Sequence, residues 1–499
     1  MRSSAASAAR AEATAGGPLG VGLTYWPALD ETIEAHQDLI DVLEVQPEML
    51  WYRDRSGADL CDRRMLSDLS ARPLAKVVHG VGNPVGGSTA PDRAHTNLVA
   101  DVVGALGADL VSEHLSFNRA PGPEGSFAGF MLPPRQTVEG VEAAVRSVRA
   151  MASQLSGLPC RFAVENGVSY LKARGDELSD GEFLAAVVSE ADVDILLDLH
   201  NAFANQCNGR QAMASFVALL PLDRVVEIHL AGGQEFEGYW LDAHCGAIPA
   251  PVAGFALDLV GSLPNLRVIN FEFLPPYLPR FGPDAIGCQL EVGRDIWAAR
   301  RSSGVRPGAG GVARPRATVG AGAGGAGRDN AGERVPASLG PTGWERALAG
   351  TVTGPATGDD EGLGPDPGLA VLRHLVGEFR AGMVARALTL TTRLLVLHLG
   401  EAGTRALMAG FWDSNPPHAF AVEEAEAFVA HLGRCCPPIP HLDEVVSFEL
   451  ALLRAFTDGE TATIGFAGDP EVVLGHLARG EIPPIPQSRR VELTVGAEY

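Results

Sequence analysis

The segment DILLDLHNA at residues 194–202 decides the fold, because an apolar run of strand length ends abruptly in polar side chains. The isoleucine and leucines before Asp198 have the composition of a strand that is buried on both faces. Asp198, His200 and Asn201 follow at once, although such side chains are seldom buried without a partner or a function. The segment therefore predicts a parallel strand whose carboxyl end carries chemically active groups.

Seven more runs of this kind occur before and after it along the chain. They are GVGLTYW (20–26), VLEVQPE (42–48), KVVHGVG (76–82), DLVSEHLSF (109–117), RFAVENG (161–167), VVEIHLAG (225–232) and RVINFEFL (267–274). The stretches between them repeat apolar residues every three or four positions, as amphipathic helices do. Strands that alternate with helices in this number predict an α/β fold, a closed (β/α)8 TIM barrel. An open doubly wound sheet is the competing fold, but GxGxxG does not follow the first strand.

Composition divides the chain of 499 residues into four parts. Residues 1–17 are small and polar, which predicts a disordered tail, and the barrel is expected to span residues 18–302. The stretch 303–364 is dominated by Gly, Ala, Pro, Arg and Thr, which predicts a flexible linker. Residues 365–499 begin with helical patterns and end with two short strand candidates, TATIGF and RVELTV. They predict a small, mainly helical α+β domain.

Charge and cysteine usage narrow the class of partner and the compartment. The chain has 39 lysines and arginines against 61 acidic residues, a formal net charge of −22, so nucleic acid is not an expected partner. No apolar stretch is long enough to cross a membrane, and the first residues lack the apolar core of a secretory signal. The seven cysteines form no CxxC pair, which favours a reducing, cytoplasmic location.

The predicted barrel makes the ends of its strands the place to look for chemistry. Twelve polar side chains lie at or just beyond these ends: His79, Glu113, His114, Glu165, Asn166, Asp198, His200, Asn201, His229, Asp242, His244 and Glu272. An ordinary hydrogen bond or salt bridge explains each one alone, but a closed barrel gathers all of them into one mouth. Carboxylates packed together repel one another unless cations neutralise them, so the joint pattern predicts a metal centre.

The residue types also constrain the metal. Imidazole and carboxylate without thiolate suit iron, manganese or zinc, and so many ligands exceed the coordination of one ion, which predicts two or three ions. Glu165 lies in the middle of the strand order and is the expected bridging carboxylate. The residues alone leave redox iron and hydrolytic zinc or manganese equally open.

Taken together, these motifs resemble the multinuclear non-heme iron-dependent oxidative enzymes, the family of the methanobactin-biosynthesis enzyme. The matching pieces are HGVG (79–82), SEHLSF (112–117), ENGVSYL (165–171), LLDLHNAF (196–203), IHLAGG (228–233), DAHCGAIP (242–249) and FEFLP (271–275). The resemblance implies a TIM barrel with two or three iron ions, in mixed Fe2+ and Fe3+ states, and dioxygen as co-substrate. It further implies oxidation of a ribosomally made precursor peptide, most often at a cysteine, in the biosynthesis of a peptide natural product (RiPP).

The resemblance also implies roles for single residues. The iron ligands would be His79, His114, Glu165, Asp198, Asn201, His229, Asp242, His244 and Glu272. Glu165, Asp198 and His229 would be the catalytic residues, and Glu113 and Asn166 are further candidate ligands. The family often has Asp-x-Asn-Asn where this chain has Asp198-Leu199-His200-Asn201, so His200 is either an added ligand or a hydrogen-bond donor beside one. The family's Glu-Asn-Pro is here Glu165-Asn166-Gly167, and both departures bear on the third iron site.

Such enzymes commonly work with a partner protein that helps to bind the peptide, and residues 365–499 resemble that partner, here in cis. Two alternatives remain. The first is a divalent-metal hydrolase or isomerase on a barrel of the xylose-isomerase type, which zinc or manganese without oxygen consumption would indicate. The second is a peptide-binding scaffold with structural metals, in which Glu165→Gln would leave activity intact. Asn166 and Arg135 are expected either to orient the substrate or to hold their own loops.

Overall fold

The structure is a computed structural model, and it describes residues 16–121, 127–302, 339–354, 363–435, 437–485 and 490–496. The predicted disordered tail, apart from its last two residues, lies outside the described residues, as does Cys436. Most of the predicted linker, at 303–338 and 355–362, also lies outside them.

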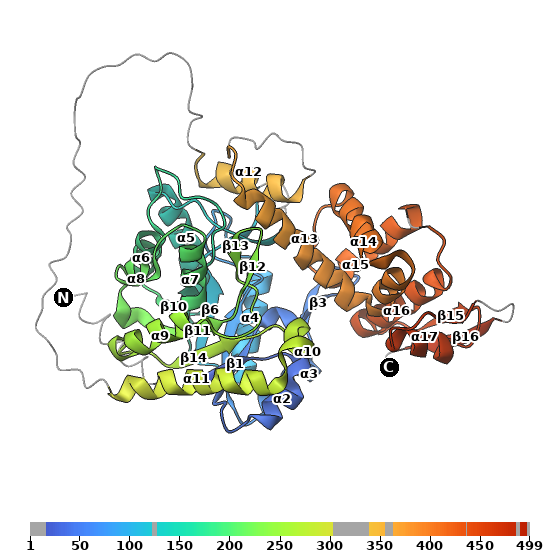
Figure 1. Ribbon diagram of the computed structural model, residues 1–499, viewed down its shortest axis with the longest axis horizontal. Helices are drawn as coiled ribbons and strands as arrows, with labels where there is room; N and C mark the ends of the chain where they lie inside the picture. The colour runs from blue at the N-terminus through green and yellow to red at the C-terminus, as the bar shows by residue number, and fades with distance from the viewer. Residues whose placement is uncertain are drawn as a thin grey trace, which may run out of the picture.

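The predicted (β/α)8 barrel is confirmed. Eight parallel strands close in the order β1-β14-β11-β10-β9-β6-β5-β2, so successive strands of the chain lie side by side (Figure 1). The strands are β1 (Gly20–Thr24), β2 (Val42–Val45), β5 (Ala75–Gly80), β6 (Leu110–His114), β9 (Arg161–Glu165), β10 (Asp194–Asp198), β11 (Val225–Ala231) and β14 (Val268–Glu272). Each predicted apolar run contains one of them. The runs are continuously apolar because the barrel interior buries one face of each strand and the surrounding helices bury the other.

A layer of helices and 3-10 turns surrounds the strands. The helices are α2 (Asp30–Ala35), α3 (Arg63–Ala71), α4 (Arg93–Leu106), α5 (Val138–Leu155), α6 (Asp180–Ala191), α7 (Leu199–Cys207), α8 (Met213–Val217), α9 (Ala250–Leu259), α10 (Leu278–Phe281) and α11 (Pro283–Ser302). The 3-10 turns are η1 (Pro27–Leu29), η2 (Pro47–Leu50), η3 (Leu222–Arg224), η4 (Val260–Ser262) and η5 (Pro275–Tyr277). Side-chain caps fix several helix starts; Ser179 and Glu182, for example, form a capping box on α6. Since helices of this fold begin on the side where strands end, such starts surround the mouth of the barrel.

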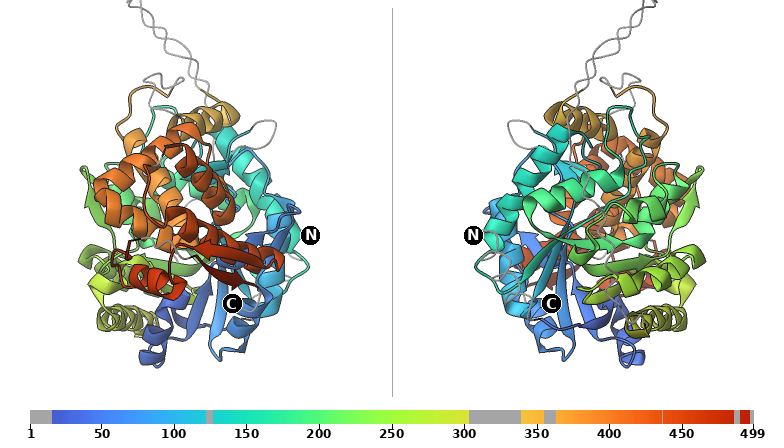
Figure 2. Two further views of the ribbon diagram at one scale, coloured as in Figure 1. Left: turned by 90° about the vertical axis from the view of Figure 1, so that its right-hand side faces the viewer. Right: turned by 90° about the vertical axis from the view of Figure 1, so that its left-hand side faces the viewer.

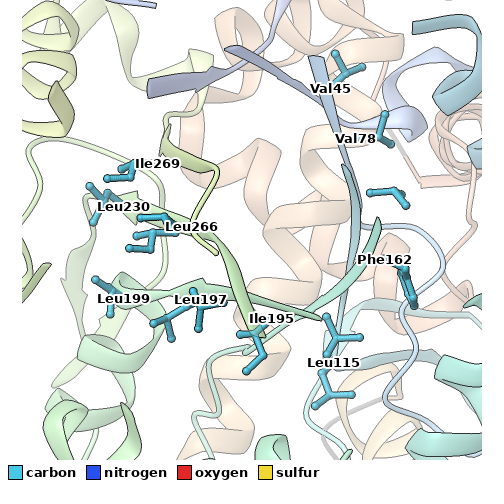
Figure 3. Packing of buried hydrophobic residues seen from close by; sticks show 14 of the residues in the cluster. Val45, Val78, Leu115, Phe162, Ile195, Leu197, Leu199, Leu230, Leu266 and Ile269 are labelled. Carbon is cyan, nitrogen blue, oxygen red and sulfur yellow. The ribbon is translucent and has the colours of Figure 1, made fainter. Parts of the chain in front are cut away.

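The barrel core has an apolar floor and a separate outer layer. Seven strands each contribute one fully buried apolar side chain to the floor: Val42, Val77, Leu110, Ala163, Leu196, Val226 and Val268. The outer layer lies between strands and helices and includes Val78, Ile195 and Ile269 (Figure 3). Inward-facing residues alternate with outward-facing ones along each strand, and the inward positions above the floor are polar. The two apolar layers hold the strand ends that form the mouth.

Three two-stranded hairpins extend from the carboxyl ends of the barrel strands and form a rim. They are β3–β4 (Trp51–Arg53 and Asp59–Cys61), β7–β8 (Phe117–Arg119 and Phe127–Leu132) and β12–β13 (Gln234–Phe236 and Tyr239–Leu241). Phe117 and Leu132 of the second hairpin are buried in a cluster shared with residues from beyond the barrel. The rim is therefore the surface on which the C-terminal part rests.

The C-terminal part is mainly helical, as predicted. Its elements are α13 (Gly368–Ala387), α14 (Thr389–Ser414), α15 (Ala421–Cys435), α16 (Leu442–Asp458), β15 (Ala462–Phe466), α17 (Pro470–Ala478) and β16 (Val491–Val495). Gly400, at φ 69°, interrupts α14 with a left-handed conformation that a glycine adopts without strain. β15 and β16 pair antiparallel and lie within the two predicted strand candidates. Arg380 and Glu424 form a buried ion pair, with 2.6 Å between Nε and Oε1.

The predicted linker is wrong over part of its length. Residues 341–353 form α12 (Pro341–Thr353), which packs with α13 on the β7–β8 hairpin (Figure 1). Trp344 is 3% exposed, and its indole N–H donates to the Pro133 carbonyl over 3.0 Å. Trp344, Leu348 and Val352 recur at helical spacing and share one buried cluster, but the glycine-rich composition around them hides this short apolar face.

The C-terminal part contacts the rim through ion pairs and rings. Arg53 on β3 lies 3.2 Å from a Glu423 carboxylate oxygen and stacks on the ring of Phe420, 4.3 Å from its centroid. Phe130 on β8 contacts Phe379 on α13, with 6.2 Å between ring centroids. In the left view of Figure 2, the orange and red helices lie in front of the barrel. The two parts therefore form a joint surface around one side of the mouth.

Taken singly, the described helices include none that is long and apolar enough to span a membrane. α13 and α14 meet at 111° and reach the required length and composition only as a pair. Their side chains Val384, Leu394 and Leu395 are buried in the core of the C-terminal part.

Candidate metal centre

Three strand ends place two histidines beside one oxygen of Glu165. His79 lies near the end of β5, His114 ends β6 and Glu165 ends β9. The Nε2 atoms of His79 and His114 lie 3.2 and 3.0 Å from Glu165 Oε2. His79 and Glu165 are each 1% exposed, so these groups meet away from bulk water. They form the first group of candidate ligands.

The other oxygen of Glu165 faces a second group, contributed by β10, β11 and β14. His229 Nδ1 lies 3.7 Å from Glu165 Oε1 and 3.0 Å from Glu272 Oε2. Asp198 completes the group, because one ligand atom of each of these four residues lies within 4.8 Å of the others. Glu165 therefore occupies the position that a carboxylate bridging two metal ions would occupy.

A loop after β13 adds Asp242 and His244 beside Glu272. His244 Nε2 lies 3.0 Å from Asp242 Oδ1 and 3.5 Å from Glu272 Oε2. His244 has φ 46°, an uncommon conformation for a residue with a side chain and one that is often found at functional sites. Gly232 makes room for this loop, because a Cβ there would lie 2.0 Å from the Cys245 carbonyl oxygen. This loop forms the third group.

Asp198 and Asn201 come from the turn where β10 passes into α7. Asp198 Oδ1 caps α7 by accepting the Asn201 N–H over 2.7 Å, which leaves Oδ2 without a hydrogen bond. Asn201 donates its amide N–H to Glu165 Oε1 over 3.3 Å, and its own Oδ1 has no partner. Asn166 both donates to and accepts from the Asp198 backbone, so its amide joins β9 to β10 and is not free to bind a metal. With Asn201, all nine predicted iron ligands come together in one mouth.

His200 has no free ring nitrogen among the described residues, because both of its ring nitrogens already have partners. Nε2 accepts the indole N–H of Trp240 over 3.0 Å, and Nδ1 lies 2.9 Å from Asp242 Oδ1. Since Nε2 accepts, the proton of the neutral ring is on Nδ1 and is donated to Asp242. His200 is fully buried. Of the two roles that the sequence left open for His200, its contacts fit the hydrogen-bond donor.

Glu113 does not join the cluster, so its prediction as a possible ligand is wrong. Ser112 and His114 both face the mouth, and adjacent residues of a strand cannot share a face. On the opposite face Glu113 lies against Gly80, where a Cβ would be 1.8 Å from Glu113 Oε2. Burial, together with the nearby Glu48 carboxylate, raises the pKa of Glu113 well above its ordinary value.

Two buried carboxylates that the sequence analysis missed lie near His229 on its inner side. Glu44 Oε2, on β2, lies 2.7 Å from His229 Nε2, while its Oε1 accepts from the Thr24 hydroxyl and the Asn270 amide, each over 2.8 Å. The register shifts between β10 and β11, a β-bulge of the kind that re-aims side chains, and Glu227 follows it with no hydrogen bond to either oxygen among the described residues. The available signal was a glutamate flanked by apolar residues in VLEV and in VVEIHL.

Arg135 is held away from the candidate ligands. Its guanidinium lies 2.7 Å from an Asp176 carboxylate oxygen, bonds to Glu177 and sits 5.2 Å from the centroid of the Trp344 ring. The side chain is 4% exposed. Of the two roles expected for Arg135, these contacts fit the one that holds its own loop.

Burial and crowding shift the pKa values of the cluster in both directions. Burial lowers the pKa of His79 and raises the pKa of Glu165 to about 7. It also raises the pKa of Asp198 well above its ordinary value, with repulsion from Glu165 adding to the effect. Burial opposes the charged form of His229, but the neighbouring carboxylates of Glu272, Glu44 and Glu227 together outweigh it and raise the pKa of this histidine. Bound cations would relieve the repulsion between these carboxylates and would displace protons.

The donor atoms of the cluster fit metal ions better than hydrogen bonds. Six buried atoms of the cluster have no hydrogen-bond partner within the part of the chain that the structure describes: Oε2 of Glu165, Oδ2 of Asp198, Oδ1 of Asn201, Nδ1 of His229, Nε2 of His244 and Oε2 of Glu272. Buried polar atoms in folded proteins are nearly always paired, so this concentration around one mouth requires a common partner. Imidazole nitrogen with carboxylate and amide oxygen is a ligand set of iron, manganese and zinc. The site is therefore a candidate metal centre.

Fold and site together define a class: a (β/α)8-barrel protein with a candidate multinuclear metal centre at the carboxyl ends of its strands. The chain belongs to the MbnB/TglH/ChrH family of RiPP precursor modification enzymes, whose family model matches residues 20–268. The matched range includes every candidate ligand except Glu272.

Relatives of the barrel part are described as UPF0276 proteins. One from Streptomyces avermitilis is 30% identical over 250 residues, which are 49% of this chain and 48% of the relative. One from Chromobacterium violaceum is 30% identical over 261 residues, which are 51% of this chain and 91% of the relative. The chain thus spans about half the length of the first relative and most of the second.

Solved structures that are similar to this chain match somewhat more than half of it. A D-tagatose 3-epimerase-like protein is 15% identical, with a TM-score of 0.38, over 57% of this chain and 98% of that protein. Endonuclease IV from Thermus thermophilus is 15% identical, with a TM-score of 0.35, over 56% of this chain and 98% of that protein.

Proposed function

We propose that this chain oxidises one residue of a ribosomally made precursor peptide, with two or three iron ions and dioxygen. Family membership supports an enzyme that modifies RiPP precursors, and the ligand set supports metal dependence. The observation that carries the proposal is the placement of Glu165, which faces a separate group of ligands with each of its two oxygens. A single ion would leave one of these groups without a cation.

Three sets of residues would hold the ions. The sets are His79 and His114 with Glu165; Asp198, His229 and Glu272 with Glu165; and Asp242 and His244 with Glu272. Asn201 Oδ1, which has no hydrogen bond among the described residues, is a further candidate ligand atom beside them. Iron, when bound there, supplies electrons for the reduction of dioxygen and a Lewis-acidic position for the substrate. Glu165, Asp198 and His229 are the proposed catalytic residues, because they lie in the set between the other two.

The chain's own residues orient the ligands and control their protons. Glu44 accepts the proton of His229 Nε2, which leaves Nδ1 free to face the centre. Ser112 Oγ, 2.9 Å from His79 Nδ1, does the same for His79, whose Nε2 faces Glu165. Burial of the cluster keeps bulk water from competing for these positions.

We infer that the modified residue is a cysteine. A thiolate is the peptide side chain that binds iron most readily, and a metal ion beside it favours the deprotonated form. The cysteines among the described residues are all free, which fits a reducing cytoplasm as the place of the reaction.

We further propose that the C-terminal part supplies in cis the peptide-binding role of a separate partner. α12 and α13 pack on the β7–β8 hairpin, whose β8 strand forms one wall of the mouth. A peptide held by this part would thus lie within reach of the centre.

Glu165→Gln tests the proposal, with Glu235→Gln on the exposed strand β12 as the matched control. Each variant is co-expressed with a cysteine-containing precursor peptide, sought among the short open reading frames beside the gene, and is purified without oxygen. We expect Glu165→Gln to lose bound iron, dioxygen consumption and the mass change of the peptide, more than about a hundredfold in turnover, because both ions lose a shared ligand. Glu235→Gln should behave as the unmodified chain.

Two results would contradict the proposal in different ways. Zinc or manganese alone in the purified protein, with no dioxygen consumed, would indicate a hydrolase or isomerase on the same barrel. A Glu165→Gln variant that still changes the mass of the peptide would indicate structural metals and a scaffold role.

A further inference from the structure

We infer that a pocket beside the metal centre binds a neutral, apolar side chain of the substrate peptide, next to the residue that reacts; the inference rests on the proposed function. The pocket encloses about 800 Å³, including the part open to solvent. His114, Asn201 and Asp242 line it and also belong to the metal centre, so the two spaces are continuous. A peptide whose reactive residue reaches the centre must place a neighbouring side chain here.

The walls of this pocket are largely apolar. Phe130, Leu132 and Pro133 form the side contributed by β8, while Phe183 and Leu184 come from α6 on the other side. Transfer of a leucine-sized group from water to such a surface strengthens binding by roughly ten- to a hundredfold. The pocket therefore favours aliphatic or aromatic neighbours of the reactive residue.

Two polar side chains in the walls, Asn205 and Asp180, are already engaged within the protein. Asn205 accepts the Ser169 N–H over 2.9 Å and donates to the Gly167 carbonyl over 3.1 Å. Asp180 is held by two nitrogens of Arg210, at 2.6 and 3.1 Å. Among the described residues, no lysine or arginine lines the pocket. An acidic side chain would lose its hydration here without gaining a counter-charge, which is costly.

Besides Asn201 Oδ1, which belongs to the metal centre, Ser116 offers a bound peptide an unpaired hydrogen-bonding group in this lining. It is 6% exposed, its Oγ has no partner, and it follows the candidate ligand His114 by two residues on the same strand end. A backbone carbonyl of the peptide would satisfy this hydroxyl and would fix the register of the peptide relative to the centre.

Gly167 allows the pocket to be filled without disturbing the fold. A Cβ at Gly167 would meet no heavy atom within 4 Å, and its φ lies outside the left-handed range. Gly157, in the exposed loop before β9, has the same two properties and does not line the pocket. Gly167→Phe and Gly157→Phe therefore form a matched pair that differs in position only.

The experiment measures peptide binding to the iron-loaded full chain by calorimetry under nitrogen. The probes are Ac-Leu-Cys-Leu-NH2, Ac-Asn-Cys-Asn-NH2 and Ac-Asp-Cys-Asp-NH2; the asparagine peptide is included because the net charge of −22 repels the aspartate peptide at long range. We expect the leucine peptide to bind at least about tenfold more tightly than the asparagine peptide. Gly167→Phe should remove this preference with its iron content unchanged, whereas Gly157→Phe should keep it. Ser116→Ala should lower the affinity for the leucine peptide by about three- to tenfold.

Equal binding of the leucine and asparagine peptides would overturn the inference. So would no binding of the leucine peptide at about 1 mM, or the same loss in both glycine variants. The peptide Ac-Leu-Ser-Leu-NH2 and its asparagine counterpart separate this inference from the proposed function. In one outcome, the serine peptides show the same preference for leucine while no cysteine peptide is oxidised in air. That result would support the inferred pocket and contradict the proposed reaction.

Discussion

His200 and Trp240 form a chain of hydrogen bonds that ends on the candidate metal ligand Asp242. The indole N–H fixes the tautomer of His200, and the ring then presents its remaining proton to Asp242. A carboxylate held in this way keeps one orientation, so binding an ion requires less ordering of the site. The same logic applies to Glu44 behind His229, where the contact is 2.7 Å.

We expect His200→Asn to weaken the third group of ligands selectively. The shorter amide cannot reach both Trp240 and Asp242, so the affinity for the ion at Asp242 and His244 should fall about ten- to a hundredfold. Anaerobic titration with ferrous iron, followed by Mössbauer spectroscopy, resolves the individual ions. His398→Asn, at an exposed position of α14, is the control. Equal affinity in the two variants would show that His200 does not position Asp242.

Arg380 and Glu424 make a second residue-level prediction, on stability. Arg380 is 1% and Glu424 is 0% exposed, so removal of the guanidinium leaves a buried carboxylate whose remaining contact is the His418 N–H. Arg380→Ala should lower the free energy of unfolding of the C-terminal part by about 3–5 kcal/mol in urea denaturation. Arg405→Ala breaks an exposed pair with Glu378 and should cost at most about 1 kcal/mol. Similar losses in both variants would contradict the view that burial makes the difference.

Among the secondary-structure elements, α12 links the C-terminal part to the wall of the mouth. Trp344 lies between two arginines, 5.2 Å from Arg135 and 4.8 Å from Arg174, and donates to the Pro133 carbonyl. Pro133 lines the pocket beside the centre. α12 thus supports a substrate-facing surface although it follows the barrel in sequence.

Trp344→Ala should release α12 from the rim. Loss of a buried tryptophan costs about 3–5 kcal/mol, which should weaken the packing of this short helix on the rim substantially. Limited proteolysis should then cut within residues 341–353, while iron content stays unchanged, because no candidate ligand touches α12. Arg346→Ala, at an exposed position of the same helix, should remain resistant. Equal resistance of the two variants would contradict the anchoring role of Trp344.

The elements also show what the sequence can and cannot reveal. The eight barrel strands were predictable, because burial on both faces leaves continuous apolar runs that end in polar residues. α12 was not, because its few large apolar residues lie in a stretch dominated by glycine, alanine, proline and threonine, the composition of a linker. Its burial depends on contacts with β8 that are distant in sequence.

The candidate site, too, could be predicted from the sequence only in part. The nine predicted ligands could be found because strand ends of a closed barrel share one mouth. Glu44 and Glu227 lie deeper in the interior, and only the register of the neighbouring strands shows that they face inward. His200 could not be assigned from spacing, because its role depends on Trp240, which lies 40 positions further along the chain.

In the whole molecule, bound metal and folding stability should be coupled. The mouth gathers more buried carboxylates than the nearby imidazoles can neutralise. In the metal-free protein some of these carboxylates must therefore stay protonated, or the charged ones repel one another. Each ion that binds only the folded chain stabilises it by about 2.7 kcal/mol at a free concentration a hundred times its Kd. The fold and the centre are thus expected to melt together.

Removal of the metal should lower the melting temperature of the barrel. Differential scanning calorimetry of the iron-loaded chain, with and without a chelator, measures this shift. The chelator should change the melting temperature of the Glu165→Gln variant little, because this variant has already lost bound iron. If the chelator left the melting temperature of the unmodified chain unchanged, the cluster would hold no ion that stabilises the fold.

Anomalous diffraction from crystals of the anaerobically iron-loaded chain, recorded on both sides of the iron absorption edge, tests the central claim most directly. We predict two or three iron peaks in the barrel mouth, with Glu165 between two of them and Asp242 and His244 beside the third when it is present. A mouth without iron peaks, or a single peak that leaves one oxygen of Glu165 without an ion, would contradict the account.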